Sequence, residues 1–487
     1  MPGCLASLLP RRDPATRPAP TAPAVRADSE KTEDGTPSPS SEVTLGPPLV
    51  GCAPEPGACL CCGSLKQDES PPGAINTFPP YTDDMSCDPP ISDAIRHTVD
   101  ATVDGLDAAL RELSLDIWEH PEVAYEEHHA HDLLTAFMAR HGFTVTPHYL
   151  GLATAWRATY THGRGGRTVC VQAEMDALPG LGHACGHNLI AAAGVAVALA
   201  LRAALQAHDV PGTVVLLGTP AEEHGGGKIA LLERGAYQDV DVCIMCHPGP
   251  GAPRSTYVAP WTAIQNLDVT YTGRTAHAAY APWEARNALD AAVLAYGAVA
   301  ALRQQVKPTH RVHGVIDAQP DWEPNVIPGS AKMRWAVRAP TWAELEVLRE
   351  RVVGCLEAAG RASACAVEVS AGVGYKDCRN NSALAEEYAR SVRAQGGSVK
   401  ISDETLQAST DLGDVSYVVP CLEPVYAIPT EDGGSNHTAK FTASARTPEA
   451  HTATLATAKC LAITALRVFT DDAFYQKVRD AFHAQRQ

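Results

Sequence analysis

The chain has 487 residues, of which 45% are hydrophobic and 20% are charged. This length exceeds one ordinary hydrophobic core, so we expect two or more domains. The formal net charge of −17 argues against a nucleic-acid partner, which normally requires a basic surface. The longest apolar run, 189–201, is too short to cross a bilayer, so we expect no membrane span and no membrane partner.

The first 90 residues are rich in Pro, Ser, Thr, Ala and Gly without a sustained apolar period, and this composition predicts disorder. The start, 1–28, bears arginines as organelle transit peptides do, but its prolines break the amphipathic helix that such peptides use. Of the 15 cysteines, the nine that lie after residue 90 show no regular spacing that would indicate disulfide pairs. Because no secretory signal is visible, we expect reduced thiols and a cytoplasmic location.

Apolar residues at helical spacing predict helices within 91–120 and 121–142. In the second segment, His128, His129 and His131 lie among acids, and we interpret them as a solvated helix face rather than a metal cluster. The pattern that follows predicts strands at 154–161, 168–173, 213–218 and 240–246, with helices at 188–207 and 228–234. Strands that alternate with helices indicate an α/β sheet covered on both faces.

The pattern changes near residue 261. The order from there to residue 375 is strand, helix, strand, strand, helix and strand, which predicts a small ferredoxin-like αβ sandwich. The sequence then returns to helices and short strands. We therefore predict a disordered segment 1–90, a catalytic domain formed by 91–260 and 376–487, and an inserted domain of 261–375.

The loop 183–187 reads His-Ala-Cys-Gly-His and connects a predicted strand to a predicted helix. It lies at the carboxyl end of the strand, where α/β proteins build their sites. Cys185 and His187 can converge on one zinc-like ion, because thiolate and imidazole are its preferred ligands. The alternative is a buried structural cysteine beside a capping histidine.

Two adjacent carboxylates, Glu222 and Glu223, follow the next Val/Leu strand. Neighbouring residues of an extended segment point to opposite sides, so one carboxylate can bind metal while the other serves as general base. The alternative is a surface pair at a helix start.

His247 ends a further strand, next to Cys243 and Cys246. The spacing of these three residues matches the c-type haem attachment pattern, but the two cysteines lie on opposite faces of a strand, which favours buried thiols instead. His437 and His277 stay ambiguous on chemistry alone. The set predicts a metal-dependent amide hydrolase.

Several phrases of the chain resemble a known family, namely DALPGLGHACGHNLI, LGTPAEEHGGGKI, PNVIP, STDLGDVS and NHTAKF. The chain is similar from about residue 125 onward to the co-catalytic metallopeptidases that include aminoacylase, carboxypeptidase G and the auxin-conjugate amidohydrolases. The subgroup it resembles is that of the aminoacylase-like β-alanyl-lysine (Xaa-Arg) dipeptidases. The resemblance implies an α/β catalytic domain with a central mixed sheet and an inserted ferredoxin-like lid that mediates dimerisation.

The resemblance also implies an activity, namely cleavage of the amide bond of dipeptides with a basic C-terminal residue by water activated by two divalent ions, zinc or manganese. Its small-molecule substrate is a dipeptide or an N-acyl amino acid. The metal-ligand positions of the family match Cys185, His187, Glu223, His247 and His437. The general base matches Glu222, and an acid that orients a metal ligand matches Asp176.

On the lid, the resemblance implies that His277 reaches the active site of a partner subunit in a homodimer and stabilises the oxyanion. Asn325 matches a substrate contact, and Arg338 is a candidate for recognition of the substrate carboxylate. Ala285 and Arg286 replace an expected Gly-Leu, and the segment 318–325 lacks a glycine pair before Asn325. These departures bear on specificity, so a general N-acyl-amino-acid amidohydrolase is the alternative. A non-catalytic scaffold is disfavoured by the intact site residues.

Overall fold

The computed structural model describes residues 91–317 and 322–485, so the predicted disorder of 1–90 falls outside the described residues. A six-stranded mixed sheet has the strand order β1-β2-β4-β3-β5-β13. The bounds are β1 Thr144–Pro147, β2 Trp156–His162, β3 Arg167–Glu174, β4 Gly212–Thr219, β5 Val242–Ile244 and β13 Cys421–Leu422. Strands β4, β3, β5 and β13 run parallel to one another, whereas β2 is antiparallel to β4 and β1 is antiparallel to β2.

Alternate residues of β3 and β4 enter different hydrophobic clusters, because successive side chains of a strand point to opposite faces. Val169 and Leu216 join the cluster beneath α4 (His187–Ala207), while Cys170 and Leu217 join the cluster on the other face. Helices α1 (Asp93–Gly105), α2 (Asp107–Glu119) and α11 (Pro448–Thr470) contact α4. Helices α5 (Gly227–Glu233) and α9 (Leu412–Ser416) contribute to the opposite cluster. Both faces of the sheet are therefore covered, as predicted.

Helices α4 and α11 are long and apolar enough to cross a membrane by composition alone. In the fold, however, 89% and 78% of their most apolar windows are buried. Their apolar residues fill the large cluster against the sheet, which accounts for their hydropathy as core helices.

A four-stranded sheet beside this core has the order β12-β7-β14-β6. Its strands are β12 Ser398–Ile401, β7 Ser255–Val258, β14 Val425–Ile428 and β6 His247–Pro250. The remaining helices of this region are α3 His128–Arg140, η1 Tyr149–Gly151, α8 Ser382–Ala394, α10 Ala439–Ser444 and α12 Asp472–Ala484. The short strand β6 follows β5 after a two-residue break, so it brings His247 to the rim of the six-stranded sheet.

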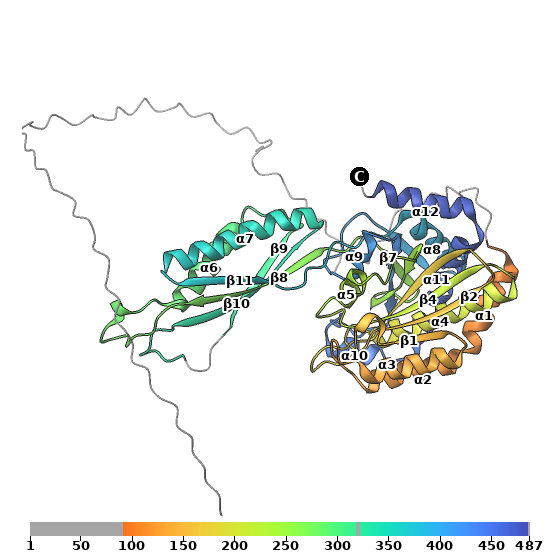
Figure 1. Ribbon diagram of the computed structural model, residues 1–487, viewed down its shortest axis with the longest axis horizontal. Coiled ribbons are helices and arrows are strands. Elements are labelled where there is room, and N and C mark those ends of the chain that lie inside the picture. The colour runs from red at the N-terminus through yellow and green to blue at the C-terminus, as the bar shows by residue number, and fades with distance from the viewer. Residues whose placement is uncertain (1–90, 318–321, 486–487) are drawn as a thin grey trace, which may run out of the picture. The chain divides into compact units, whose positions relative to one another are not determined.

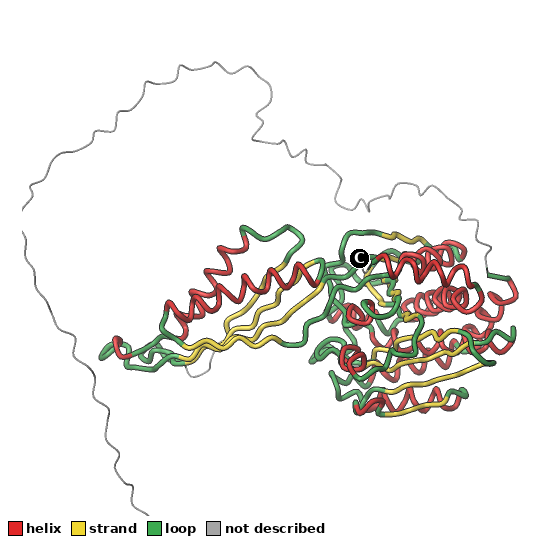
Figure 2. Tube along the Cα trace, turned by 45° about the horizontal axis from the view of Figure 1, so that its top comes forward, coloured by secondary structure: helices red, strands yellow, loops and turns green. Residues whose placement is uncertain are grey.

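Residues 263–371 form a third sheet with the order β11-β8-β10-β9, in which all neighbours are antiparallel. Its elements are β8 Ala263–Thr272, η2 Pro282–Glu284, α6 Ala288–Arg303, β9 Arg311–Asp317, β10 Ser330–Ala339, α7 Trp342–Ala362 and β11 Ala366–Ala371. Helices α6 and α7 lie on one face of this sheet (Figures 1 and 2). Alternating residues such as Leu267 and Met333 pack beneath them in a separate hydrophobic cluster. The predicted α/β fold with mixed sheets is confirmed, whereas the exact domain boundaries stay a prediction.

Two local predictions require correction. The helical pattern of 91–120 forms two helices, which meet at Leu106 immediately after Gly105, a residue with low helix propensity. The placement of His131 on a solvated face is wrong, because its exposed fraction is 3% and its imidazole stacks on that of His148. Nδ1 of His131 donates to Oδ1 of Asp132 at 2.8 Å, and its Nε2 accepts the backbone N–H of His148 at 3.4 Å, so the polar ring is satisfied inside the fold.

Candidate active site and metal centre

The two adjacent glutamates lie on a turn, and the prediction that they extend strand β4 is wrong. Pro220 follows the end of the strand, and Ala221 adopts a left-handed backbone with φ of 57°. The turn closes so tightly that a Cβ atom at Gly227 would lie 1.8 Å from the backbone oxygen of Pro220. As a result Glu222 and Glu223 both approach the same imidazole instead of facing opposite sides.

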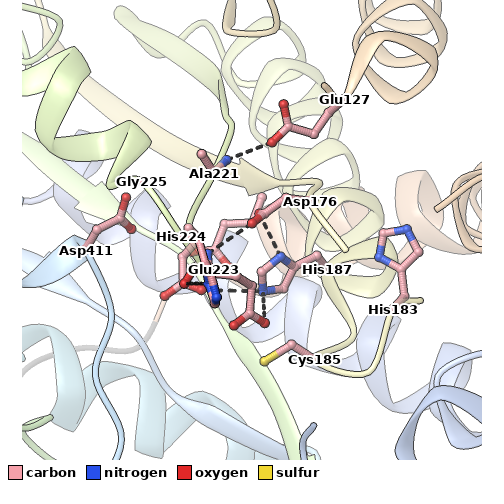
Figure 3. Close-up of polar contacts among 12 residues, drawn as sticks. Glu127, Asp176, His183, Cys185, His187, Ala221, Glu223, His224, Gly225 and Asp411 are labelled. Atoms are coloured by element: carbon pink, nitrogen blue, oxygen red, sulfur yellow. Dashed lines mark hydrogen bonds and ion pairs between the residues drawn. The ribbon is translucent and has the colours of Figure 1, made fainter. Parts of the chain in front are cut away.

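That imidazole belongs to His187, the first residue of α4 (Figure 3). Its Nδ1 hydrogen bonds to Asp176 Oδ1 at 3.0 Å, and Asp176 Oδ2 accepts the backbone N–H of Glu223 at 3.0 Å. Its Nε2 lies 3.5 Å from Glu174 and 3.8 Å from each of the two turn glutamates. A proton on Nδ1 leaves Nε2 with a free lone pair, which is the form that binds metals.

Cys185 and His247 form the second part of the site. The Sγ of Cys185 lies 3.3 Å from Nε2 of His247, and both side chains are buried. Nδ1 of His247 donates to the backbone oxygen of Pro248 at 2.9 Å. This bond assigns the proton to Nδ1 and directs the Nε2 lone pair toward the thiol, so both imidazoles present a free nitrogen.

His437 reaches the site from the loop before α10. Its Nε2 lies 3.3 Å from Glu223, and its backbone N–H donates to the oxygen of Ala184, three residues before His187. The backbone of His437 has a φ of 66°, a left-handed conformation that non-glycine residues seldom adopt. Strain of this kind clusters at functional sites.

These side chains fit divalent cations by their chemistry. Three overlapping groups each have their ligand atoms within 4.8 Å of one another. They are Cys185–His187–His247, Cys185–Glu223–His437 and Glu174–His187–Glu222. Nε2 of His187, Oε1 of Glu223 and Oε2 of Glu174 are buried and make no hydrogen bond. Buried polar atoms are normally paired, so orphaned acceptors that face one another indicate a place for a cation.

The electrostatics of the site favour a positive charge at the same place. Burial lowers the pKa of His187, but Asp176 and other carboxylates outweigh burial and hold it well above its usual range. Burial, with Glu174 and Glu223, raises the pKa of Glu222 well above its usual range. Burial likewise raises the pKa of the Cys185 thiol. A divalent ion among these groups would reverse the last two shifts, because it stabilises thiolate and carboxylate.

Three residues that hold the site were missed by the sequence analysis. The buried carboxylate of Glu127 accepts the backbone N–H of Ala221 at 2.8 Å, and so supports the strained start of the glutamate turn. The hydroxyl of Tyr375 contacts the other end of that turn. The ammonium of Lys228 is fully buried between Glu174 and Asp411. Because these contacts join residues more than fifty positions apart, no local sequence signal reveals them.

A cavity of about 600 Å³ opens over the site. It is lined by Cys185, Glu222, Glu223, His247, Trp261, Arg338, Ser409, Asn436 and His437, among others. The guanidinium of Arg338 donates to the hydroxyl of Ser409 at 2.8 Å, and burial lowers its pKa. His277 and Asn325 do not line this cavity. They lie together on the surface of the lid, where the backbone N–H of Ala278 donates to the oxygen of Asn325.

Comparisons with known proteins agree with this architecture. Peptidase family M20/M25/M40 matches residues 170–458, more than half of the chain. The chain belongs to this peptidase family. This chain is 43% identical over 390 residues to the Xaa-Arg dipeptidase of Mus musculus, and the match covers 77% of this chain and 89% of the mouse protein. The Xaa-Arg dipeptidase of Homo sapiens is 42% identical with the same coverage.

Among solved structures, a dinuclear metal-binding M20 peptidase of Bacillus subtilis superposes with a TM-score of 0.59 and 19% identity. The match covers 75% of this chain and 99% of the bacterial protein, and it supports the fold. The family predicted from the sequence is thereby confirmed, and this protein is a hydrolase of peptide bonds. The roles of its individual site residues stay predictions.

Proposed function

We propose that the protein is a metal-dependent dipeptidase that cleaves dipeptides with a C-terminal lysine or arginine. The observation that carries the proposal is the convergence of Cys185, His187, Glu223, His247 and His437 on one end of the sheet, beside a buried free carboxylate. The preference for a basic residue is supported by the 43% identity to an Xaa-Arg dipeptidase.

Two divalent ions, zinc or manganese, suit this mixed set of thiol, imidazole and carboxylate ligands. Cys185 contacts His247, and Glu223 lies near both His187 and His437, so these side chains would together hold the ions. When bound, such ions act as Lewis acids toward an amide carbonyl and increase the acidity of water. Asp176 orients His187 through Nδ1 and fixes Glu223 through its backbone N–H.

Glu222 is the general base in this proposal. Its carboxylate borders the cavity and lies outside both ligand groups that contain Cys185, although it is 3.8 Å from Nε2 of His187. We assign it to accept a proton from the attacking water. Burial raises the pKa of Glu222, and divalent ions beside it would lower that pKa again, so the ionised form that a general base requires is favoured when the ions are bound. Glu222 then donates that proton to the nitrogen of the leaving amine, and the amide bond is broken.

Arg338 lines the same cavity as Glu222 and Glu223, and we assign it to the C-terminal carboxylate of the substrate. A guanidinium binds a carboxylate through two parallel N–H donors, which also fixes the orientation of the peptide. His277 and Asn325 lie outside the cavity of their own chain, which supports the proposal that they act across a homodimer. The nine cysteines of the described residues are free thiols, which supports a cytoplasmic location.

The test is hydrolysis by the purified full-length protein of β-alanyl-lysine, other Xaa-Lys and Xaa-Arg dipeptides, and N-acetyl amino acids. Each substrate is assayed with added Zn²⁺ or Mn²⁺ and with a chelator. We expect chelator-sensitive cleavage of the basic dipeptides. Cleavage of only the acetylated compounds would replace the proposed specificity by that of an N-acyl-amino-acid amidohydrolase. Absence of turnover on both substrate sets would contradict the enzymatic proposal.

A further inference from the structure

A second group of metal-ligand side chains lies at the surface, where α2 ends and α3 begins. Asp116 belongs to α2, His120 follows that helix as its C-cap, and His129 belongs to the first turn of α3. Nδ1 of His120 lies 2.9 Å and Nε2 of His129 lies 2.8 Å from the same oxygen, Oδ1 of Asp116. The two imidazole rings are 4.3 Å apart.

The arrangement has the features of a metal chelate. One ligand atom from each of the three side chains lies within 4.8 Å of the others. Asp116 and His120 are four residues apart, so they share one helix face, while His129 approaches from the neighbouring helix. Side-chain exposures of 35%, 56% and 40% leave the group accessible to an ion from solvent and leave room for water as a further ligand.

The neighbouring histidines do not share this arrangement. His128 pairs with Glu126, and His131 is buried against His148. Only His129 of the three histidines in α3 turns toward α2. The sequence predicts that the three histidines form a solvated helix face, whereas the tertiary structure pairs His129 with Asp116 and His120 at the end of the neighbouring helix.

We propose that Asp116, His120 and His129 form a peripheral binding site for a divalent transition-metal ion of the zinc class. Two imidazoles and one carboxylate are borderline ligands that favour Zn²⁺, Ni²⁺ or Cu²⁺ over Mg²⁺ or Ca²⁺. On binding, the three side chains exchange their mutual hydrogen bonds for bonds to the ion, and Nδ1 of His120 gives up its 2.8 Å hydrogen bond to the backbone oxygen of Asp116. The site contains no thiol, which distinguishes it from the centre at Cys185.

An ion at this position would join α2 to α3 next to the catalytic loops. The carboxylate of Glu122 accepts the backbone N–H groups of His129 and Ala130, at 2.8 and 3.0 Å. The backbone oxygen of Glu122 accepts the N–H of Ala177, the residue after Asp176, at 2.7 Å. The peripheral ion therefore stabilises the segment that supports Asp176, without contact with substrate.

The test compares the full-length wild-type protein with the double variant His120→Ala/His129→Ala and with the control variant His128→Ala. Each protein is stripped of metal, dialysed against Zn²⁺ alone, and analysed for bound zinc. We expect the double variant to hold one equivalent fewer per chain than wild type and control. Equal zinc contents in all three proteins would overturn the proposal.

A second readout locates the lost equivalent. With Co²⁺ in place of Zn²⁺, the difference spectrum between wild type and double variant should lack the near-ultraviolet band of a thiolate ligand, because Asp116, His120 and His129 supply only nitrogen and oxygen. A thiolate band in that difference would assign the lost ion to the Cys185 centre and overturn the proposal. Asp116→Asn, which keeps the side-chain volume, should reproduce the loss of zinc; its failure to do so would remove Asp116 from the site. Neither outcome depends on the proposed dipeptidase activity.

Discussion

The hydroxyl of Tyr375 donates a hydrogen bond to the backbone oxygen of Glu222 at 2.8 Å. The same hydroxyl accepts the backbone N–H of Gly226 at 3.0 Å, so it clamps the turn that carries both glutamates. Tyr375 also exchanges two backbone hydrogen bonds with Ile264, near the start of β8. Tyr375 therefore connects the base of the lid, through its backbone, to the proposed general base, through its hydroxyl.

Replacing Tyr375 by phenylalanine should lower kcat without a matching change in KM or in metal content. The change leaves the backbone oxygen of the buried Glu222 without its hydroxyl donor, whereas the N–H of Gly226 keeps its bond to the oxygen of Ala221. Such a loss costs about 1–3 kcal/mol, which corresponds to roughly a two- to tenfold fall in kcat if half of it is realised at Glu222. Steady-state kinetics on a cleaved dipeptide, with metal analysis, check the prediction. Tyr271→Phe is the matched control, because its hydroxyl donates to Leu356 within the lid. Equal effects of the two variants would contradict a specific role of Tyr375.

Glu222→Gln should retain both metal ions and lose about 10²–10⁴-fold in kcat, because an amide has no basic oxygen that can accept the proton of water. The measurement is kcat together with bound metal per chain. Wild-type turnover in this variant would remove Glu222 from the role of general base. The geometry of the turn should be preserved, since Tyr375 holds Glu222 through the backbone oxygen of Glu222, which the substitution does not change.

Cys185→Ala should lower the bound metal, because it removes the only thiol within the two ligand groups that contain cysteine. Cys246→Ala is the control, since that thiol is buried beside His247 but belongs to none of these groups. Elemental analysis after dialysis distinguishes the variants. Identical metal contents in Cys185→Ala and wild type would show that the thiol is not a ligand.

Two inactive variants should complement each other if His277 acts across a dimer. Glu222→Gln and His277→Ala are purified separately, mixed under conditions that permit subunit exchange, and assayed. A mixed dimer contains one site with both Glu222 and a partner's intact lid, so we expect activity above that of either variant alone. Persistent inactivity, despite exchange shown by labelled subunits, would contradict action across the dimer.

Lys228→Met should destabilise the protein by about 3–5 kcal/mol, because it leaves the carboxylates of Glu174 and Asp411 buried without their cation. Denaturant unfolding of the metal-free protein measures the change in the free energy of unfolding. The control is Lys307→Met, which breaks an exposed pair with Glu344 and should change stability by less than about 1 kcal/mol. A comparably small effect at Lys228 would contradict the buried-pair interpretation.

Sequence patterns alone predict the family, the α/β class and a candidate set of metal ligands. Cys185 and His187 lie in one short loop, and Glu222 and Glu223 are adjacent, so local order in the chain already brings unusual ligand chemistry together. The βαββαβ order of 263–371 was likewise visible, because alternating and helical apolar periods differ in sequence.

Only the tertiary structure decided how these groups face one another. The glutamates turn toward one imidazole because Pro220, Ala221 and Gly227 bend the chain after β4. The spacing of apolar residues in the sequence does not predict that bend. The supports at Glu127, Tyr375 and Lys228, like the pairing of His129 with His120, join segments that are distant or on different elements. Such contacts arise when helices and strands pack, and a linear pattern specifies the apolar face of an element but not which polar side chains meet at its ends.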